Sequence, residues 1–168
     1  MITLDTNIDI NKWARKVLDR IDDFKYTTNI IIKNSFSDLA FNMVAETPVD
    51  TGTAVANWIV FKGSSPDYTN FNYGDISGVG EDYANAVAKN ITERIDALEI
   101  NIFKAKNTKF GIVNNTEYIL TLENGLYPWA NSENVINHYS IQAPEGMVKI
   151  NLLKKDEIVN ANIAKWKK

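Results

Sequence analysis

At residues 47–53 the chain reads Thr-Pro-Val-Asp-Thr-Gly-Thr, and Ala-Val-Ala-Asn-Trp follows at residues 54–58. Pro48 predicts the end of a helix, because the residue before a proline is pushed out of the helical region of backbone space. Asp50 and Gly52 favour a tight turn, since a short acidic side chain accepts local amide bonds and glycine tolerates positive φ. The stretch therefore predicts a corner between a helix and a strand.

The strand that leaves this corner is expected at residues 53–61. Val55, Ile59 and Phe61 would lie on one of its faces, and Trp58 with its small apolar neighbours would lie on the other. Because both faces are largely apolar, we expect this strand to be central in its sheet or covered on both sides.

Before the corner, residues 7–47 form a helical pattern with two apolar stripes. The first stripe is Trp13, Val17, Ile21 and Phe24. The second, shifted in phase by about one residue, is Ile32, Phe36, Leu39, Ala40 and Met43.

Between these stripes, residues 26–29 read Tyr-Thr-Thr-Asn, a run of poor helix formers. One unbroken helix of about 40 residues would be roughly 60 Å long, whereas a compact domain of this size is only about 40 Å across. We therefore expect a break near residues 26–29. The alternative is a single helix that projects from the domain to meet a neighbour.

After the corner the pattern predicts four more elements. They are a helix at residues 81–103, a short strand at 108–114, a short helix at 116–125 closed by a glycine cap, and a last helix at 145–165. The stripe of this last helix is Val148, Leu152, Val159, Ile163 and Trp166. The whole chain, residues 1–168, fits a single domain.

Composition limits the function. The formal net charge is −3 and the chain has no cysteine, so neither bulk attraction to nucleic acid nor a thiolate metal site is expected. The first residues lack the basic end and apolar run of a signal peptide. No stretch approaches the length of a membrane span. We expect a protein that is made and used in a cytoplasm, without a membrane partner.

Catalytic patterns are weak. His138 is the single histidine, and without an assigned acid or nucleophile it is interpreted as an ordinary surface residue. Asp50 is interpreted as a turn residue held by an Asx-type bond rather than as a catalytic acid. Glu123 lacks a catalytic partner, so a local cap or ion pair is the simpler interpretation. The sequence predicts a protein that is not an enzyme, with no catalytic residue, metal site or cofactor.

Two irregular segments, residues 63–80 and 126–143, exceed the usual length of a connection. Their aromatic residues are candidates for contacts with other subunits, although packing on the domain's own surface is the alternative. These candidates are Tyr68, Phe71, Tyr73, Tyr127 and Trp129. Among the tryptophans we expect Trp129 to be exposed, whereas Trp13, Trp58 and Trp166 lie on apolar stripes and are expected in the core.

Residues 47–58 resemble a signature of small bacteriophage tail-completion or neck proteins, in which a helix is followed by Pro-Val-Asp-Thr-Gly and a strand ending in Ser-Trp or Asn-Trp. The matching residues are Pro48, Val49, Asp50, Thr51, Gly52 and Trp58. Residues 116–125 are similar to the family's short helix ending in Leu-Glu-x-Gly. Residues 142–148, Gln-Ala-Pro-Glu-Gly-Met-Val, are similar to the start of its C-terminal helix.

The resemblance implies an α+β domain, in which a long N-terminal helical region, a central helix and a C-terminal helix pack with a small, mainly antiparallel sheet. It also implies a structural virion protein of the neck or tail, assembled in the host cytoplasm. The chain would form a ring, hexamer or dodecamer, that contacts connector or adaptor proteins and tail or tail-terminator proteins. DNA would pass through the lumen without sequence-specific binding. The alternative is a small adaptor or regulatory binding module outside the virion.

Overall fold

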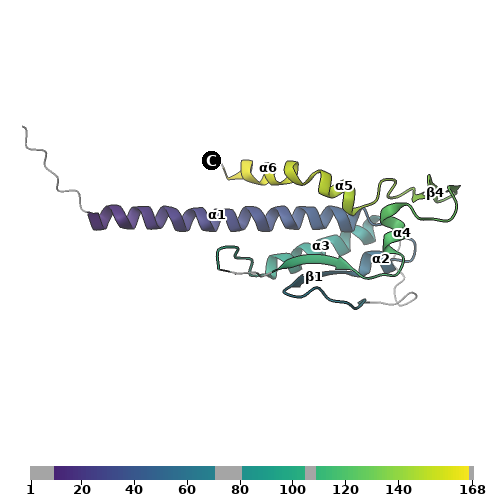
Figure 1. The fold of residues 1–168 in the computed structure, drawn as a ribbon, viewed down its shortest axis with the longest axis horizontal. Helices are drawn as coiled ribbons and strands as arrows, with labels where there is room; N and C mark the ends of the chain where they lie inside the picture. The colour runs from purple at the N-terminus through teal and green to yellow at the C-terminus, as the bar shows by residue number, and fades with distance from the viewer. Residues whose placement is uncertain (1–9, 71–80, 105–108, 167–168) are drawn as a thin grey trace, which may run out of the picture.

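The computed structural model describes residues 10–70, 81–104 and 109–166. Its elements confirm the predicted α+β class, with a long helix, further helices packed on it and small antiparallel sheets (Figure 1). In order they are α1 Ile10–Ala45, α2 Thr53–Ala56, β1 Trp58–Lys62, α3 Glu81–Ala97, β2 Phe110–Asn114, α4 Ile119–Asn124, β3 Asn131–Ser132, β4 Val135–Ile136, β5 Tyr139–Ser140, α5 Val148–Leu153 and α6 Lys155–Lys165. Within the described ranges, none of the helices is long and apolar enough to cross a membrane.

The first helix is continuous over 36 residues, so the predicted break at residues 26–29 is wrong, and the helix is single and projects from the packed part of the protein (Figure 1). The hydroxyl of Thr28 donates to the carbonyl of Phe24 at 2.8 Å, which satisfies this polar side chain within the helix. The propensity penalty of such residues is only about 0.5 kcal/mol each. That cost is small beside the packing of the C-terminal half of α1.

That C-terminal half of α1 lies between two layers (Figure 1). On one side it packs against α3, and on the other against α5 and α6, which run back along it. The core at the α1–α3 contact is built from small and branched side chains, which let the helices approach closely. Its buried residues include Ala40, Val44, Ala84, Ala88, Ile91 and Ile95.

The corner after α1 differs from the predicted strand at residues 53–61. Residues 53–56 form the helical turn α2, and the strand begins at Trp58. Gly52, with φ of 84°, starts this turn in the left-handed region. The side-chain amide of Asn57 then donates to the carbonyl of Thr53 at 2.9 Å, which holds the turn closed.

The sheet that follows has two strands in the described part of the chain, with β1 antiparallel to β2 and Trp58 opposite Asn114. Among the described strands β1 is therefore not central, whereas the other predicted possibility, cover on both sides, is confirmed at the start of the strand. Trp58 and Ile59 are buried, but the strand becomes exposed by Lys62. The apolar residues of α2, which the sequence assigned to the strand, are instead buried in the core. The predicted strand at residues 108–114 is confirmed over Phe110–Asn114.

The helix expected at residues 81–103 ends at Ala97. A turn replaces its last part, because side chains satisfy the backbone there. Asn29 of α1 accepts from the amide of Ile102 at 3.0 Å, and the side-chain oxygen of Asn101 accepts from the amides of Phe103 and Lys104, both at 3.1 Å.

The segment expected to be irregular at residues 126–143 contains the three-stranded meander β3–β4–β5. Its second hairpin turns through Asn137 and His138, whose φ angles are 51° and 68°. Two successive residues with positive φ are the requirement of a type I′ turn, which matches the twist of paired strands. The strands are only two residues long, too short to give a clear alternating pattern.

The last helix, expected at residues 145–165, is divided at Lys154 into α5 and α6. Its inward side carries amides. Asn162 is fully buried and donates to a carboxylate oxygen of Asp38 at 2.8 Å. Asn151, also fully buried, donates to the carboxylate of Glu46. Hydrogen bonds to charged acceptors are strong enough to offset burial of the amide nitrogens, whereas the Oδ1 atom of Asn151 is buried without a partner among the described residues.

As a consequence, the stripe predicted to face the core is partly at the surface. Val148 and Ile163 are half-buried, whereas Leu152, Val159 and Trp166 are exposed. The expectation that Trp166 belongs to the core is wrong, because the polar pairs with α1 turn that stripe aside. Trp58 is buried and Trp129 is exposed, as predicted.

The glycine cap predicted for the short helix is confirmed at Gly125, which ends α4 with φ of 62°. A Cβ atom there would lie 2.4 Å from the ring of Tyr139, whereas one at Gly63, with φ of 99°, would meet nothing within 4 Å.

Gly125→Ala should therefore lower the free energy of unfolding by about 2–4 kcal/mol, from positive-φ strain and overpacking. Gly63→Ala should lower it by about 1 kcal/mol from strain alone. Equal losses in urea-unfolding curves would contradict the role assigned to the Tyr139 contact.

Candidate functional site

The corner is fastened to the end of α1 by one buried hydroxyl. The Oγ1 atom of Thr47 donates to the carbonyl of Met43 at 2.7 Å and accepts the indole N–H of Trp58 at 2.9 Å. Both side chains are buried, so the indole N–H would be left unsatisfied without this partner. The first and last residues of the Thr47–Trp58 stretch are thereby joined across the turn.

The turn itself is held from a distant segment. The side chain of Gln142 accepts from the backbone N–H of Val49 at 2.8 Å, and its amide nitrogen lies 3.5 Å from the carbonyl of Val49. An extended amide side chain can satisfy both backbone groups of one residue in this way. Residues 47–58 and residues 142–148 are therefore in direct contact.

Glu123, near the end of α4, caps the start of α5. Its carboxylate accepts from the backbone amides of Met147 at 2.9 Å, Val148 at 2.8 Å and Lys149 at 2.8 Å. The exposed N–H groups at a helix start and the helix dipole both favour a carboxylate there. The prediction that Glu123 is a capping residue is confirmed, although the helix it caps lies 24 residues further along the chain rather than nearby.

Gly146 permits this approach. Its φ is 80°, and a Cβ atom there would lie 2.5 Å from the carbonyl oxygen of Glu123. The three sequence segments singled out above, residues 47–58, 116–125 and 142–148, are therefore bound to each other at one end of the molecule. Glu123, in residues 116–125, accepts from backbone amides of residues 142–148. Gln142, in residues 142–148, bonds the backbone of residues 47–58.

A cleft of about 590 Å³ opens beside the turn. Its lining brings together the turn, the start of α4 and the segment that carries the β3–β5 meander. The lining residues central to the argument are Asp50, Gly52, Tyr118, Tyr127, Trp129 and Gln142. Two of the aromatic candidates, Tyr127 and Trp129, are thus placed beside the Pro-Val-Asp-Thr-Gly residues.

The two aromatic rings at the cleft are held in place by the type I′ hairpin. The ring centroids of Tyr127 and Trp129 are 5.9 Å apart. The Nδ1 atom of His138 lies 2.7 Å from the carbonyl oxygen of Tyr127, so this nitrogen carries the proton and donates. Trp129 remains 50% exposed. The result is a positioned aromatic pair in which half-buried Tyr127 packs against the core and Trp129 lies at the surface.

Electrostatics at the cleft favours neutral phenols. Burial raises the pKa of Tyr127, and the negative charge of Asp50 raises it further. Burial also raises the pKa of Tyr118, while hydrogen bonds with Thr53 and Ala54 act in the opposite direction. Both hydroxyls are therefore protonated at neutral pH and can donate to an acceptor on a partner.

Asp50 does not hold the turn as predicted. In the described part of the chain its carboxylate makes neither a hydrogen bond nor an ion pair, and the side chain is exposed at the cleft. The Asx-type interpretation is wrong, because Gly52 and Gln142 already determine the backbone of this corner. Thr51 and Thr53 hydroxyls contact each other at 3.0 Å. The carboxylate of Asp50 instead places an exposed negative charge at the wall of the cleft.

Of the remaining candidates, Tyr68 is exposed and lies away from the cleft lining. Its backbone is held by Asn115, whose side-chain amide donates to the carbonyls of Pro66 and Tyr68 at 3.0 and 2.9 Å. Phe71 and Tyr73 lie outside the described residues.

Among the residues that the structure describes, no group of three or more histidine, aspartate or glutamate side chains is arranged to hold a metal ion.

The sequence missed Tyr118 and Gln142 as site residues. Tyr118 precedes α4, and its aromatic character in a polar stretch was an available signal. Gln142 lies within residues 142–148, which resemble the start of the family's C-terminal helix, but its contact with Val49 spans 93 residues, and a single sequence carries no sign of such a pairing.

A comparison of the chain with protein-family models, curated proteins and solved structures finds no match.

The cap at α5 can be tested with an isosteric change. Glu123→Gln keeps the shape but removes the charge that accepts from three backbone amides, so it should lower the free energy of unfolding by about 1–2 kcal/mol. Glu117→Gln, at an exposed position of the same segment, is the matched control and should change stability by less than about 0.5 kcal/mol. Chemical denaturation measures both, and a loss no larger than that of the control would contradict the cap.

Proposed function

We propose that this chain is a structural virion protein of a tailed bacteriophage, a tail-completion or neck component that forms a ring at the head–tail junction and leaves a lumen for DNA. The observation that carries the proposal is that the three segments of the family resemblance bind each other. Glu123 and Gln142 connect segments separated by 24 to 93 residues. A chance likeness in three separate stretches would not be expected to meet at one corner.

The cleft supports the docking part of this function. Exposed aromatic residues held on a rigid backbone are typical anchors of protein interfaces, because they bury much area at little cost in side-chain entropy. Trp129 and Tyr127 are held in this way by the hairpin, and Asp50 adds a charge that can orient a partner. A neighbouring subunit or a connector protein is the occupant this surface suits.

In this function the chain acts mechanically. A ring at the junction must oppose the force of packaged DNA, which requires subunits that do not deform at their contacts. The corner meets this requirement, because it is bonded from three directions, through the Thr47 hydroxyl and the backbone amides of Val49 and Met147. The net charge of −3 is of the same sign as DNA, so a lumen lined by such subunits would not retain a passing duplex.

The decisive experiment uses the phage that encodes this chain. Quantitative mass spectrometry of purified particles should find the chain in a fixed number of copies, and a null mutant should accumulate filled heads and separate tails. Particles that lack the chain but remain joined and infectious would sink the proposal. They would favour the alternative, an adaptor that acts outside the virion.

The docking role of the cleft has its own test. Trp129→Ser should leave the thermal unfolding midpoint within a few degrees, because this side chain is half exposed, yet reduce complementation of the null phage by at least tenfold, because the exposed interface anchor is lost. Leu120→Ser, at an exposed residue of α4 outside the cleft lining, is the control and should complement normally. Full complementation by Trp129→Ser would show that the cleft is not the docking surface.

A further inference from the structure

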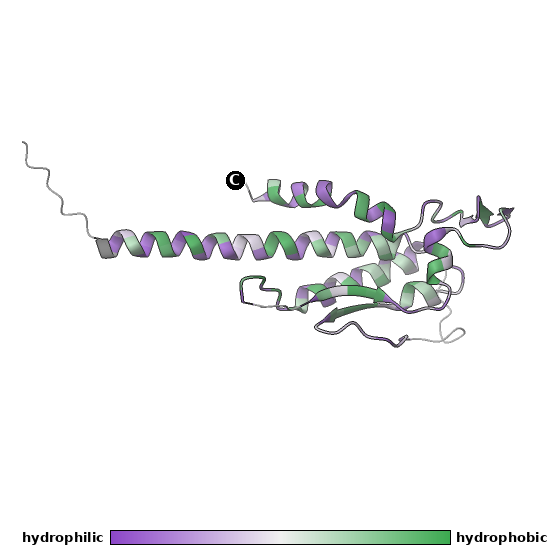
Figure 2. Ribbon diagram, in the orientation of Figure 1, coloured by the Kyte–Doolittle hydropathy of each residue, from purple (hydrophilic) through white to green (hydrophobic). Residues whose placement is uncertain are grey.

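The N-terminal part of α1 projects beyond the packed part of the protein (Figure 1). From residue 12 to residue 24 the side chains are exposed, apart from half-buried Ala14. Several of them are large and apolar, as the green bands along this part of α1 in Figure 2 show. We call Trp13, Val17, Ile21 and Phe24 the tip stripe. The expectation that Trp13 belongs to the core is wrong, since its side chain is 62% exposed.

The tip stripe lies on a defined side of the helix. At about 100° per residue its four members fall within an arc of about 80°. Asp38 and Glu46, which bind α6 and α5, project in directions within or next to that arc. The stripe therefore continues, toward the N-terminus, the same face of α1 that α5 and α6 cover further along. Over the projecting part, none of the residues that the structure describes covers that face.

The exposed apolar area is too large for a surface without a partner. Trp13 and Phe24 are 62% and 65% exposed, and aromatic side chains of this kind bury roughly 150–250 Å² each. Those two residues alone therefore expose about 200–300 Å², and Val17 and Ile21 add to it. Two such faces brought together approach the lower range of specific protein interfaces. An isolated helix of this length is also marginal in water without tertiary support.

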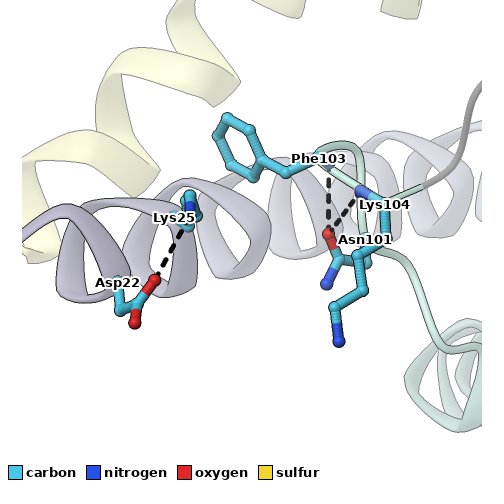
Figure 3. Close-up of polar contacts among 5 residues, drawn as sticks. All are labelled: Asp22, Lys25, Asn101, Phe103 and Lys104. Atoms are coloured by element: carbon cyan, nitrogen blue, oxygen red, sulfur yellow. Dashed lines mark hydrogen bonds and ion pairs between the residues drawn. The ribbon is translucent and has the colours of Figure 1, made fainter. Parts of the chain in front are cut away.

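The base of the stripe is fixed by the turn after α3. The ring centroid of Phe103 lies 6.3 Å from that of Phe24. Figure 3 shows Phe103 extending from this turn toward α1, with Asn101 accepting from the amides of Phe103 and Lys104. Phe103 is itself 45% exposed, so it widens the apolar surface at this end. The contact between Phe24 and Phe103 thus joins the last residue of the tip stripe to the packed part of the protein.

The charges beside the stripe identify the occupant. Residues 12–16 carry only basic charges, on Lys12, Arg15 and Lys16, whereas in residues 19–23 the acidic Asp19, Asp22 and Asp23 outnumber the single basic Arg20. Asp22 also pairs with Lys25 at 3.2 Å within the helix (Figure 3), an exposed contact of small energy that a partner can replace. Two identical helices with this order of charges attract each other when they run in opposite directions.

We propose that the projecting parts of α1 from two copies of this chain pair antiparallel through the tip stripe. With the two-fold axis between residues 18 and 20, Trp13 of one copy packs against Phe24 of the other, and Val17 packs against Ile21. Lys16 and Asp23 lie seven residues apart on the same flank of the stripe, so Lys16 of each copy meets Asp23 of the other. A parallel pair would instead place like charges at the same level.

This contact is isologous, meaning that both copies use the same surface. It lies at the opposite end of the molecule from the cleft (Figure 1). The proposal therefore does not depend on the neck function. A ring formed through the cleft end and a two-fold pair formed through α1 are separate interfaces, and each can fail without the other.

The test is a charge exchange on the purified full chain, measured by sedimentation velocity over a dilution series. Lys16→Glu and Asp23→Lys should each raise the dimer dissociation constant about tenfold, because each creates two like-charge contacts per dimer. Lys16→Glu combined with Asp23→Lys should restore it to within about twofold of the original. Residues 16 and 23 are two turns apart within one helix, so restoration cannot come from a contact inside one chain.

Two controls accompany the exchange. Ile21→Ser should weaken the dimer by at least tenfold, whereas Leu153→Ser, which removes an exposed apolar residue of α5, should not. Lys89→Glu on α3 is the control for charge reversal. If the chain also forms a ring, the single charge variants should halve the mass of the assembly rather than dissolve it.

Three outcomes would overturn the proposal. The first is a chain that stays monomeric up to about 100 µM, a concentration at which pairing through such a surface should be detectable. The second is a double variant no better than either single one. The third is a monomer that binds phosphatidylglycerol vesicles through Trp13 and Phe24, which would make a lipid surface the occupant of the stripe.

Discussion

The structure depends on the hydroxyl of Thr47, which bonds the end of α1 to the indole of Trp58. This hydroxyl is buried, so neither of its partners can exchange it for water. Just before Pro48, which ends the helix, it joins the last turn of α1 to the first residue of β1 and so determines how the sheet leaves the helix. The remaining contacts of the corner follow from that geometry, because Val49 and Gly52 are brought to positions that Gln142 and α2 can reach.

The local parts of the fold could be predicted from the sequence. Pro48 as a helix stop and Gly125 as a helix cap each act through their own backbone preference, and both are where they were expected. The helical turn at residues 53–56 could not be predicted from periodicity. Its run of small and β-branched apolar residues also suits a strand, and the choice was made by Asn57 and Asn114, which bond its carbonyls.

The side of a helix that is buried was harder to predict than the helix itself. In α6 the amide of Asn162 faces α1 and Val159 is exposed, because Asp38 supplies a charged acceptor from a distant part of the chain. In the projecting part of α1 an ordinary apolar stripe is exposed, because none of the described elements lies over it. A periodicity argument assumes that an apolar face is covered by its own chain. It holds for α3, where Ala84, Ala88, Ile91 and Ile95 are buried, and fails where the cover is polar or where none of the described elements covers the face.

The two ends of the molecule therefore differ in how they are stabilised. At the corner, Glu123 and Gln142 bond the backbone of distant segments, so the cleft beside Tyr127 is already in its final shape before any partner arrives. At the tip of α1, by contrast, an apolar surface is exposed. A preformed cleft lowers the entropic cost of docking, whereas an exposed stripe supplies the apolar area that drives association. The neck role proposed above would use both, and the two surfaces are separated along the length of α1.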